Sequence, residues 1–211
     1  MSRTMPQIAS SGGIKRRGFL KGVGWAGVGT VLTMGAGGLL SACALPGAAA
    51  QLKAAQVTGF TLVQISDTHI GFDTAGVNPH AADTMQQVVA RVNALPQRPA
   101  LVVHTGDVSH LSKPEQWDTA QQILSTLKAD NVLFLPGEHD TIGDQGAAFR
   151  KRFIKDVRPK DYFSLNFKGV HIVGLSNIGV EDKFGVLGAT QLDWLRKDLQ
   201  GVSHETPVVV F

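Results

Sequence analysis

Three short motifs carry the residue types that could do chemistry in this chain. They read Asp67-Thr68-His69, Gly106-Asp107 and Gly137-Glu138-His139-Asp140, and each directly follows an apolar run. Carboxylates and imidazoles gathered in one place can bind a divalent cation or exchange protons with a substrate. The donor types suit borderline-hard cations such as manganese, iron or zinc. The motifs therefore predict a metal site or an acid–base site.

The elements that must position these motifs can be predicted from hydrophobic spacing. Strands are expected over 60–66, 101–105 and 132–135, and helices over 80–95 and 114–128. The order strand, helix, strand, helix, strand implies parallel pairing with helices covering the sheet. Ligands at strand ends are typical of an α/β enzyme, which is the fold class that we expect.

The remaining residues predict a different pattern of elements. A hairpin is expected over 162–167 and 170–175, followed by a helix over 190–199 and a strand over 207–211. Leucines should form the inward face of that helix: Leu192, Leu195 and Leu199. Because the sequence ends inside an apolar strand, we expect the C-terminal part of the domain to be missing from it.

Residues 1–50 have the composition of an export leader and not of a folded domain. Five basic residues and no acidic one lie between Met1 and Lys21, and the stretch from Gly22 to Leu52 is uncharged. A basic start followed by a weakly apolar, glycine-rich segment is the anatomy of an export signal. Residues 51–59 are then a linker to a domain that occupies 60–211. We expect a periplasmic or otherwise exported protein.

The leader contains two more specific patterns. Arg16-Arg17-Gly18-Phe19-Leu20-Lys21 resembles a twin-arginine signal, which would make the twin-arginine export machinery a partner. Leu40-Ser41-Ala42-Cys43 resembles a lipobox, in which Cys43 would carry a membrane lipid anchor. Two alternatives stay open: cleavage after Ala48-Ala49-Ala50, and retention of the apolar stretch as a transmembrane helix.

Charge and cysteine content exclude several classes of function. The formal charge of +3 arises in the leader, because the residues after Lys21 sum to −2. The sequence therefore has no nucleic-acid-binding signature. Cys43 is the single cysteine, so the chain has neither an intramolecular disulfide nor a cysteine-based zinc cluster.

Taken together in order and spacing, the three motifs resemble those of the calcineurin-like metallophosphoesterase family. The resemblance extends from Phe60 to Phe211. It implies a four-layer αββα sandwich and a hydrolase that acts on a phosphomonoester or phosphodiester. It also implies two divalent metal ions (Mn, Fe or Zn), with a hydroxide bridging the two metals as nucleophile.

The resemblance also implies a role for each motif residue. Asp67 and His69 would bind the first metal, Asp107 would bridge both, and Glu138 would occupy the position of a ligand to the second. His139 would face the substrate phosphate as a catalytic residue. Asp140 would hold that imidazole oriented and protonated.

Position 138 departs from the family pattern, which has an asparagine there. A glutamate is longer and anionic, so it should tighten cation binding and lower the Lewis acidity of the pair. We favour ligation by Glu138, and the alternative is that it swings away to an arginine.

The histidine ligands that the family carries further along the chain do not occur in this sequence. We therefore expect this 211-residue form to bind metal weakly and to hydrolyse little. The alternative function is a non-catalytic exported binding protein that keeps the fold without a complete metal pair. Of the other histidines, His104 is expected to pack behind the site, whereas His110 could reach a substrate or donate to a ligand carboxylate.

Overall fold

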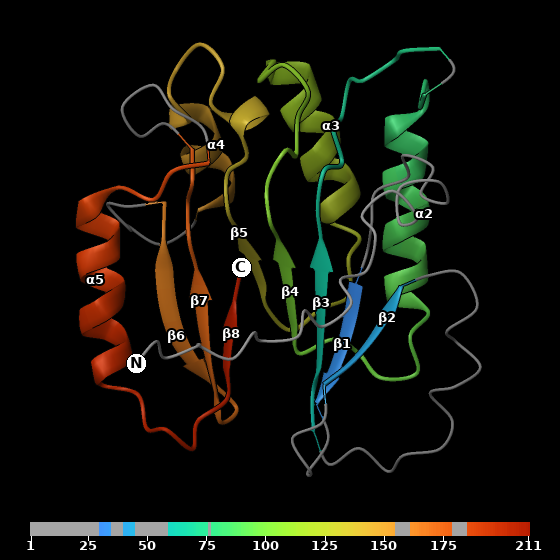
Figure 1. Ribbon diagram of the computed structural model, residues 1–211. Coiled ribbons are helices and arrows are strands. Elements are labelled where there is room, and N and C mark those ends of the chain that lie inside the picture. The colour runs from blue at the N-terminus through green and yellow to red at the C-terminus, as the bar shows by residue number, and fades with distance from the viewer. Residues whose placement is uncertain (1–29, 35–39, 45–58, 76, 155–160, 179–184) are drawn as a thin grey trace, which may run out of the picture.

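The computed structural model describes residues 30–34, 40–44, 59–75, 77–154, 161–178 and 185–211, with side chains from residue 59 onward. Figure 1 shows the arrangement of its strands and helices. The strands are β1 (Thr30–Met34), β2 (Leu40–Ala44), β3 (Thr61–Ile65), β4 (Leu101–His104), β5 (Val132–Phe134), β6 (Phe163–Phe167), β7 (Val170–Gly174) and β8 (Val208–Val210). The α-helices are α2 (Ala81–Asn93), α3 (Pro114–Leu124), α4 (Ala147–Phe153) and α5 (Ala189–Gln200), and η3 (Glu138–Asp140) is a short 3₁₀-helix.

The described strands form two sheets. The first has the order β2-β1-β3-β4-β5, and its strands β3, β4 and β5 are parallel, as the sequence predicts. The second has the order β6-β7-β8, in which β6 and β7 are the expected antiparallel hairpin and β8 is parallel to β7. Lys168 and Gly169 both have positive φ at the hairpin turn, which matches the right-handed twist of the flanking strands.

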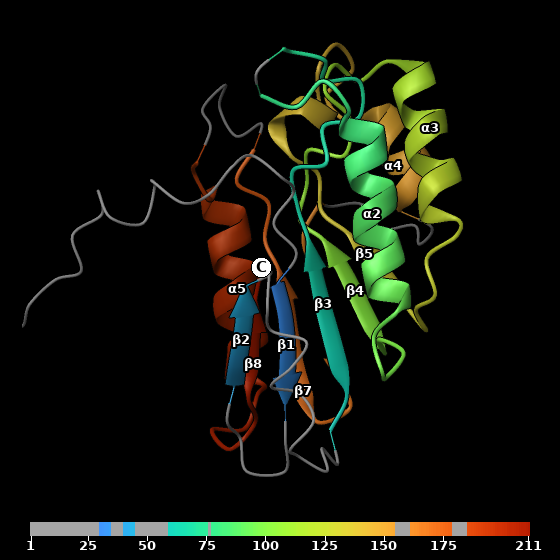
Figure 2. The same cartoon turned by 90° about the vertical axis from the view of Figure 1, so that its right-hand side faces the viewer.

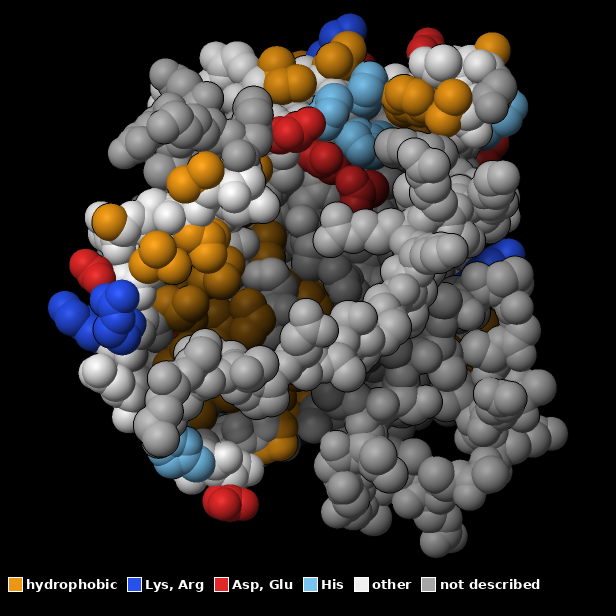
Figure 3. Space-filling model, viewed as in Figure 1, with side chains coloured by type: hydrophobic (Ala, Val, Ile, Leu, Met, Phe, Trp, Pro, Cys, Tyr) orange, Lys and Arg blue, Asp and Glu red, His pale blue; other side chains and the backbone are white. Residues whose placement is uncertain are grey.

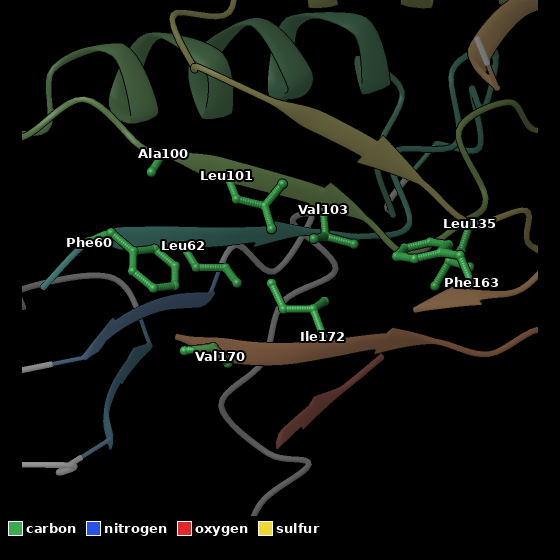
Figure 4. Packing of buried hydrophobic residues seen from close by; sticks show 9 residues of the cluster. All are labelled: Phe60, Leu62, Ala100, Leu101, Val103, Leu135, Phe163, Val170 and Ile172. Atoms are coloured by element: carbon green, nitrogen blue, oxygen red, sulfur yellow. The ribbon is translucent and has the colours of Figure 1, made fainter. Parts of the chain in front are cut away.

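The two sheets pack face to face around one apolar cluster. Phe60, Leu62, Leu101 and Val103 of the first sheet meet Ile172 of the second, as Figure 4 shows. Alternation along a strand sends the intervening residues to the opposite face of the first sheet, where the helices cover them. This burial on both faces explains why these strands are almost continuously apolar in sequence.

Helices cover the outer face of each sheet, which completes the four-layer αββα arrangement. Helices α2, α3 and α4 lie against the first sheet, and α5 lies against the second, as the turned view in Figure 2 shows. Met85, Val89 and Val92 form the buried face of α2, as expected from their spacing. Trp117 of α3 is almost completely buried and belongs to the core.

Helix α5 is rotated relative to the prediction. Leu192 and Leu199 were expected inward but are exposed. Gln191 is buried instead, because its amide exchanges hydrogen bonds with the backbone of Ser176. Polar anchoring by Gln191, and not the leucine spacing, therefore sets the face that α5 presents to the second sheet.

Only a small part of the proposed leader lies among the described residues. Strand β1 pairs with β2 and with β3, both antiparallel, so residues 30–34 and 40–44 extend the first sheet. The sequence predicts no fold elements in this region. The arginine pair and the alternative cleavage point lie outside the described residues. No helix in the described part of the chain has the length and apolar character that a bilayer crossing needs.

Candidate metal centre

Strand register brings the three sequence motifs to one edge of the first sheet. Ile65 pairs with His104 on β4, and His104 pairs with Phe134 on β5, so the three strands end side by side. The residues that follow them therefore meet at this edge. Figure 3 shows acidic and histidine side chains gathered there, near the top of the view.

Asp67, His69 and Asp107 form a compact set of possible metal ligands. Each offers one ligand atom, and these atoms lie within 4.8 Å of one another. The Nε2 atom of His69 is 3.7 Å from Oδ1 of Asp67 and 3.7 Å from Oδ2 of Asp107. Two carboxylates and one imidazole are a donor set that suits manganese, iron or zinc. These residues therefore fit a divalent cation.

The backbone of all three residues has left-handed conformation. Their φ angles are 56° for Asp67, 40° for His69 and 54° for Asp107. Non-glycine residues adopt positive φ rarely, at a cost of about 1–3 kcal/mol each, and they do so mostly at functional sites. This shared strain is independent support for a site at these positions.

Backbone hydrogen bonds between the two loops hold these strained conformations. The N–H of Asp67 donates to the carbonyl of Gly106, at 3.1 Å, and the N–H of His69 donates to the carbonyl of Asp107, at 2.9 Å. The N–H of Ile70 continues the ladder to the carbonyl of Val108. The loops after β3 and β4 thus fix each other.

The loop after β5 approaches Asp107 so closely that it requires a glycine. A Cβ atom on Gly137 would lie 2.1 Å from Oδ1 of Asp107, and one on Gly106 would lie 2.6 Å from the Gly137 nitrogen. The N–H of His139 donates to the same Oδ1 atom, at 2.9 Å. This contact leaves Oδ2 of Asp107 on the side of His69.

Electrostatics couple the three residues. The neighbouring His69 imidazole lowers the pKa of Asp67, and Asp67 in turn raises the pKa of His69. Burial raises the pKa of Asp107, against the effect of the His139 N–H. Without a cation, the two carboxylates therefore favour the protonated, positively charged form of the His69 ring. A bound divalent ion would supply that positive charge in place of the proton.

His104 packs behind the centre, as predicted. The N–H of Gly106 donates to its Nδ1 atom, so its Nε2 carries the hydrogen and donates to Oγ of Thr68, at 3.1 Å. The Thr68 hydroxyl donates in turn to the carbonyl of Val108. Complete burial lowers the pKa of His104 to about 4, so the ring is neutral and serves to position both loops.

Asp140 accepts hydrogen bonds from the backbone of two loops. Its buried carboxylate accepts the backbone N–H groups of Val108, Ser109 and Gly137, at 3.0–3.1 Å. It therefore ties the loops after β4 and β5 together, and its expected effect on the His139 ring stays a prediction. Burial raises the pKa of Asp140 to about 6, although the three N–H donors oppose this effect.

The His139 ring is oriented by a backbone carbonyl. Its Nδ1 atom lies 2.6 Å from the carbonyl oxygen of His110, which accepts the Nδ1 hydrogen. This bond does not involve Nε2, which is therefore available to another partner. The His110 ring stacks on the His139 ring with a centroid separation of 4.9 Å. Burial, together with the neighbouring His139 and His69 rings, lowers the pKa of His110.

Glu138 lies at the rim of the centre with a half-exposed side chain. Its Oε1 atom is 3.8 Å from Nε2 of His139, and it lines a cavity of about 220 Å³ together with Asp67 and Asp107. These contacts place Glu138 beside the cavity, and its assignment as a metal ligand stays a prediction.

Sequence reasoning missed residues of the second sheet that line the same cavity. Asn177 and Ile178 follow β7, and Gly185 donates its N–H to the carbonyl of Asn177, at 2.8 Å. A polar residue directly after a buried strand was the signal that identified the other three motifs, and it could have identified Asn177 as well. The cavity is therefore built from both sheets.

The sequence of residues 60–210 matches the model of the calcineurin-like phosphoesterase family. The chain belongs to this family. The match covers every predicted metal ligand and both predicted catalytic residues, and it agrees with the four-layer fold and the strand-end centre.

Curated relatives of the chain include phosphodiesterases. A glycerophosphodiester phosphodiesterase from Enterobacter lignolyticus is 36% identical over 37% of this chain and 29% of its own length. A probable cyclic nucleotide phosphodiesterase from Rhodopseudomonas palustris is 28% identical over 71% of this chain and 55% of its own length. Another probable cyclic nucleotide phosphodiesterase, from Vesicomyosocius okutanii, is 25% identical over 59% of this chain and 52% of its own length. The chain thus spans about half the length of these relatives, or less.

The fold is also similar to that of a solved structure, the purple acid phosphatase PPD1 from yellow lupin seeds. The TM-score is 0.50 at 13% identity, over 73% of this chain and 32% of the lupin chain. This likeness supports the layer arrangement alone.

Proposed function

We propose that this protein is a metal-dependent phosphoester hydrolase with a preference for phosphodiesters. The observation that carries the proposal is the convergence of Asp67, His69 and Asp107, all in left-handed conformation, at one edge of the sheet. Its support is the family to which the chain belongs.

The residues of the centre would hold two cations. Asp67, His69 and Asp107 would hold a divalent cation, and Glu138 would help to hold a second one from the rim of the cavity. When bound, such a pair supplies a nucleophile at neutral pH and neutralises charge on the phosphoryl oxygens. Asp107 is suited to face both positions, because the His139 N–H holds one of its oxygens in place.

His139 would act on the leaving group. The His110 carbonyl accepts the Nδ1 hydrogen, so the ring keeps one orientation whether or not Nε2 is protonated. Nε2 could then donate a proton to the departing oxygen, and a general acid of this kind contributes about 10²–10⁴-fold. Asp140 supports this geometry by holding the backbone of the loop that carries His139.

The preference for diesters follows from the relatives. The names of three of them are those of phosphodiesterases, one for glycerophosphodiesters and two for cyclic nucleotides. The cavity is open and contains Asn177 beside the acidic residues, so a polar group on the substrate could be bound there.

The test is a phosphoester panel on the full product of the gene, loaded in turn with Mn²⁺, Fe²⁺ and Zn²⁺. Bis(p-nitrophenyl) phosphate should be hydrolysed faster than p-nitrophenyl phosphate. Asp107→Asn should lower the rate by at least about 100-fold, since even an outer-shell change at a metal site costs about 10–100-fold. The matched control is Asp130→Asn, because Asp130 pairs with Arg98 at the other end of the sheet.

Two results would contradict the proposal. Equal rates for Asp107→Asn and Asp130→Asn would mean that the centre does not perform the hydrolysis. Metal binding without hydrolysis of any ester would favour the non-catalytic binding protein.

We also propose that the protein is exported through the twin-arginine route, on the basis of Arg16, Arg17 and the apolar segment that follows. The protein should then occur in the periplasmic or membrane fraction. Replacement of both arginines by lysine should retain it in the cytoplasm, and unchanged fractionation would refute the route. A free thiol at Cys43 of the mature protein would refute the lipid anchor.

A further inference from the structure

Three histidine rings meet beside the carboxylate-based centre. The ring centroids are 4.7 Å apart for His69 and His139, 4.9 Å for His110 and His139, and 5.6 Å for His69 and His110. One nitrogen of each ring lies within 4.8 Å of one nitrogen of each other ring. The three residues come from the loops after β3, β4 and β5, so the fold itself assembles the cluster.

The hydrogen bonding of these rings leaves nitrogens free to bind a ligand. The His110 carbonyl accepts the Nδ1 hydrogen of His139, which leaves the lone pair on Nε2 of the neutral ring. A histidine that ligates a metal almost always uses its other nitrogen in this way. The Nδ1 atoms of His69 and His110 are buried and have no hydrogen-bond partner among the described residues. Buried polar atoms without a partner cost free energy, and a ligand would relieve that cost.

We propose that His69, His110 and His139 form a second, all-imidazole metal site that takes one ion of Zn²⁺, Co²⁺, Ni²⁺ or Cu²⁺. Imidazole suits these ions, whereas carboxylates favour Mg²⁺ and Mn²⁺. The two donor sets share His69. An ion in the imidazole site would therefore lie next to the carboxylate-based centre.

The spacing requires only a small adjustment for such an ion. Zn–N bonds of 2.0–2.1 Å in a tetrahedron imply nitrogen separations of about 3.4 Å. The observed limit of 4.8 Å can contract to that value by rotation of side chains that are only partly buried. A fourth position then stays open to water or to an anion.

The site has one consequence that rests on the proposed function. An ion held by His139 would remove that ring from the substrate, so an excess of Zn²⁺ should inhibit a Mn²⁺-loaded enzyme. The existence of the site does not depend on hydrolysis, and its test therefore measures binding alone.

The experiment is a titration of the metal-free 211-residue chain with Co²⁺, followed by the visible absorption of the bound ion. Wild type should give the spectrum of a nitrogen-rich, low-coordinate site. His110→Gln should weaken this Co²⁺ binding by at least about 100-fold, since loss of an outer-shell partner alone costs about 10–100-fold. His80→Gln is the matched control, because His80 is exposed at the start of α2.

Asp67→Asn separates the two donor sets. Its side chain is more than half exposed, and it belongs to the carboxylate-based set only. This variant should keep the nitrogen-rich Co²⁺ spectrum while it loses Mn²⁺ affinity. His110→Ala is a second variant, which shows whether an effect of His110→Gln is particular to glutamine. Circular dichroism of every variant checks that it folds.

The outcomes decide the proposal whether or not the protein hydrolyses an ester. Loss of the spectrum in both His110 variants and its retention in Asp67→Asn would support the imidazole site. An unchanged spectrum in the His110 variants, or its loss in Asp67→Asn alone, would overturn it.

Discussion

At the scale of single residues, the centre depends on backbone conformation as much as on residue type. Asp67, His69 and Asp107 were identifiable from the sequence because each follows an apolar strand. Their left-handed conformations were not, because positive φ in a non-glycine residue arises from the hydrogen bonds of a neighbouring loop. The hydrogen bonds of Asp140 were not predictable for the same reason, since its partners are backbone groups of another strand end.

His104 leads to a prediction about pH and stability. Its pKa is about 4 in the folded protein, below the ordinary value of 6.5, so the unfolded chain takes up the proton first. The stability that depends on the neutral ring is fully present above pH 6.5 and is lost as the pH falls toward 4. The full effect is about 3 kcal/mol by linkage.

The measurement is the free energy of unfolding between pH 4 and pH 7 for wild type and His104→Gln. The variant should be less stable at neutral pH, and the difference between the two proteins should shrink as the pH falls. His80→Gln, at an exposed histidine, should follow the wild type throughout. A constant difference between wild type and His104→Gln would show that His104 is not neutral in the fold.

At the scale of elements, hydrophobic spacing predicted most of the strands and helices that meet the core, but not α4, whose Phe149 and Phe153 are buried. The parallel strands, the hairpin and α2 were predicted on this basis, and the start of α3 at Pro114 was predicted because proline suits a first helical turn. Spacing failed for α5, where Leu192 and Leu199 are exposed. Polar contacts with the second sheet determine its rotation, and such contacts between distant residues leave no period in the sequence.

The buried pair of His171 and Asp198 is the second of these contacts. Nε2 of His171 lies 2.8 Å from Oδ2 of Asp198, and its Nδ1 lies 2.7 Å from Oδ1 of Asn166. Ser164 donates to the other carboxylate oxygen. The pair thus joins α5 to strands β6 and β7.

Asp198→Asn should therefore destabilise the protein by about 2 kcal/mol, because hydrogen bonds to charged groups contribute about 1.5–3 kcal/mol. Asp193→Asn is the matched control on the same helix, since Asp193 forms an exposed pair with Arg196. That change should shift stability by less than about 0.5 kcal/mol, as is usual for surface pairs. Urea denaturation measures both variants, and equal effects would mean that the buried pair does not hold α5.

At the scale of the whole molecule, two sheets packed face to face bring the ends of both to one cavity. The loops after the three parallel strands supply the candidate ligands, and the segment after β7 closes the other side of the cavity with Asn177 and Ile178. The four layers were expected only through the family resemblance, because the order of strands and helices specifies an α/β class and not the packing of two sheets. The same packing brings Asn177 to the centre, and its place after a buried strand is the one signal for it in the sequence.

The central claim is that Asp67, His69 and Asp107 together bind a divalent cation. The most direct test is the anomalous difference density of manganese in crystals of the full gene product grown with Mn²⁺. We predict a peak within coordination distance of the Asp67 and Asp107 carboxylates and of Nε2 of His69. Manganese bound only at other positions, with these three side chains free of it, would contradict the account.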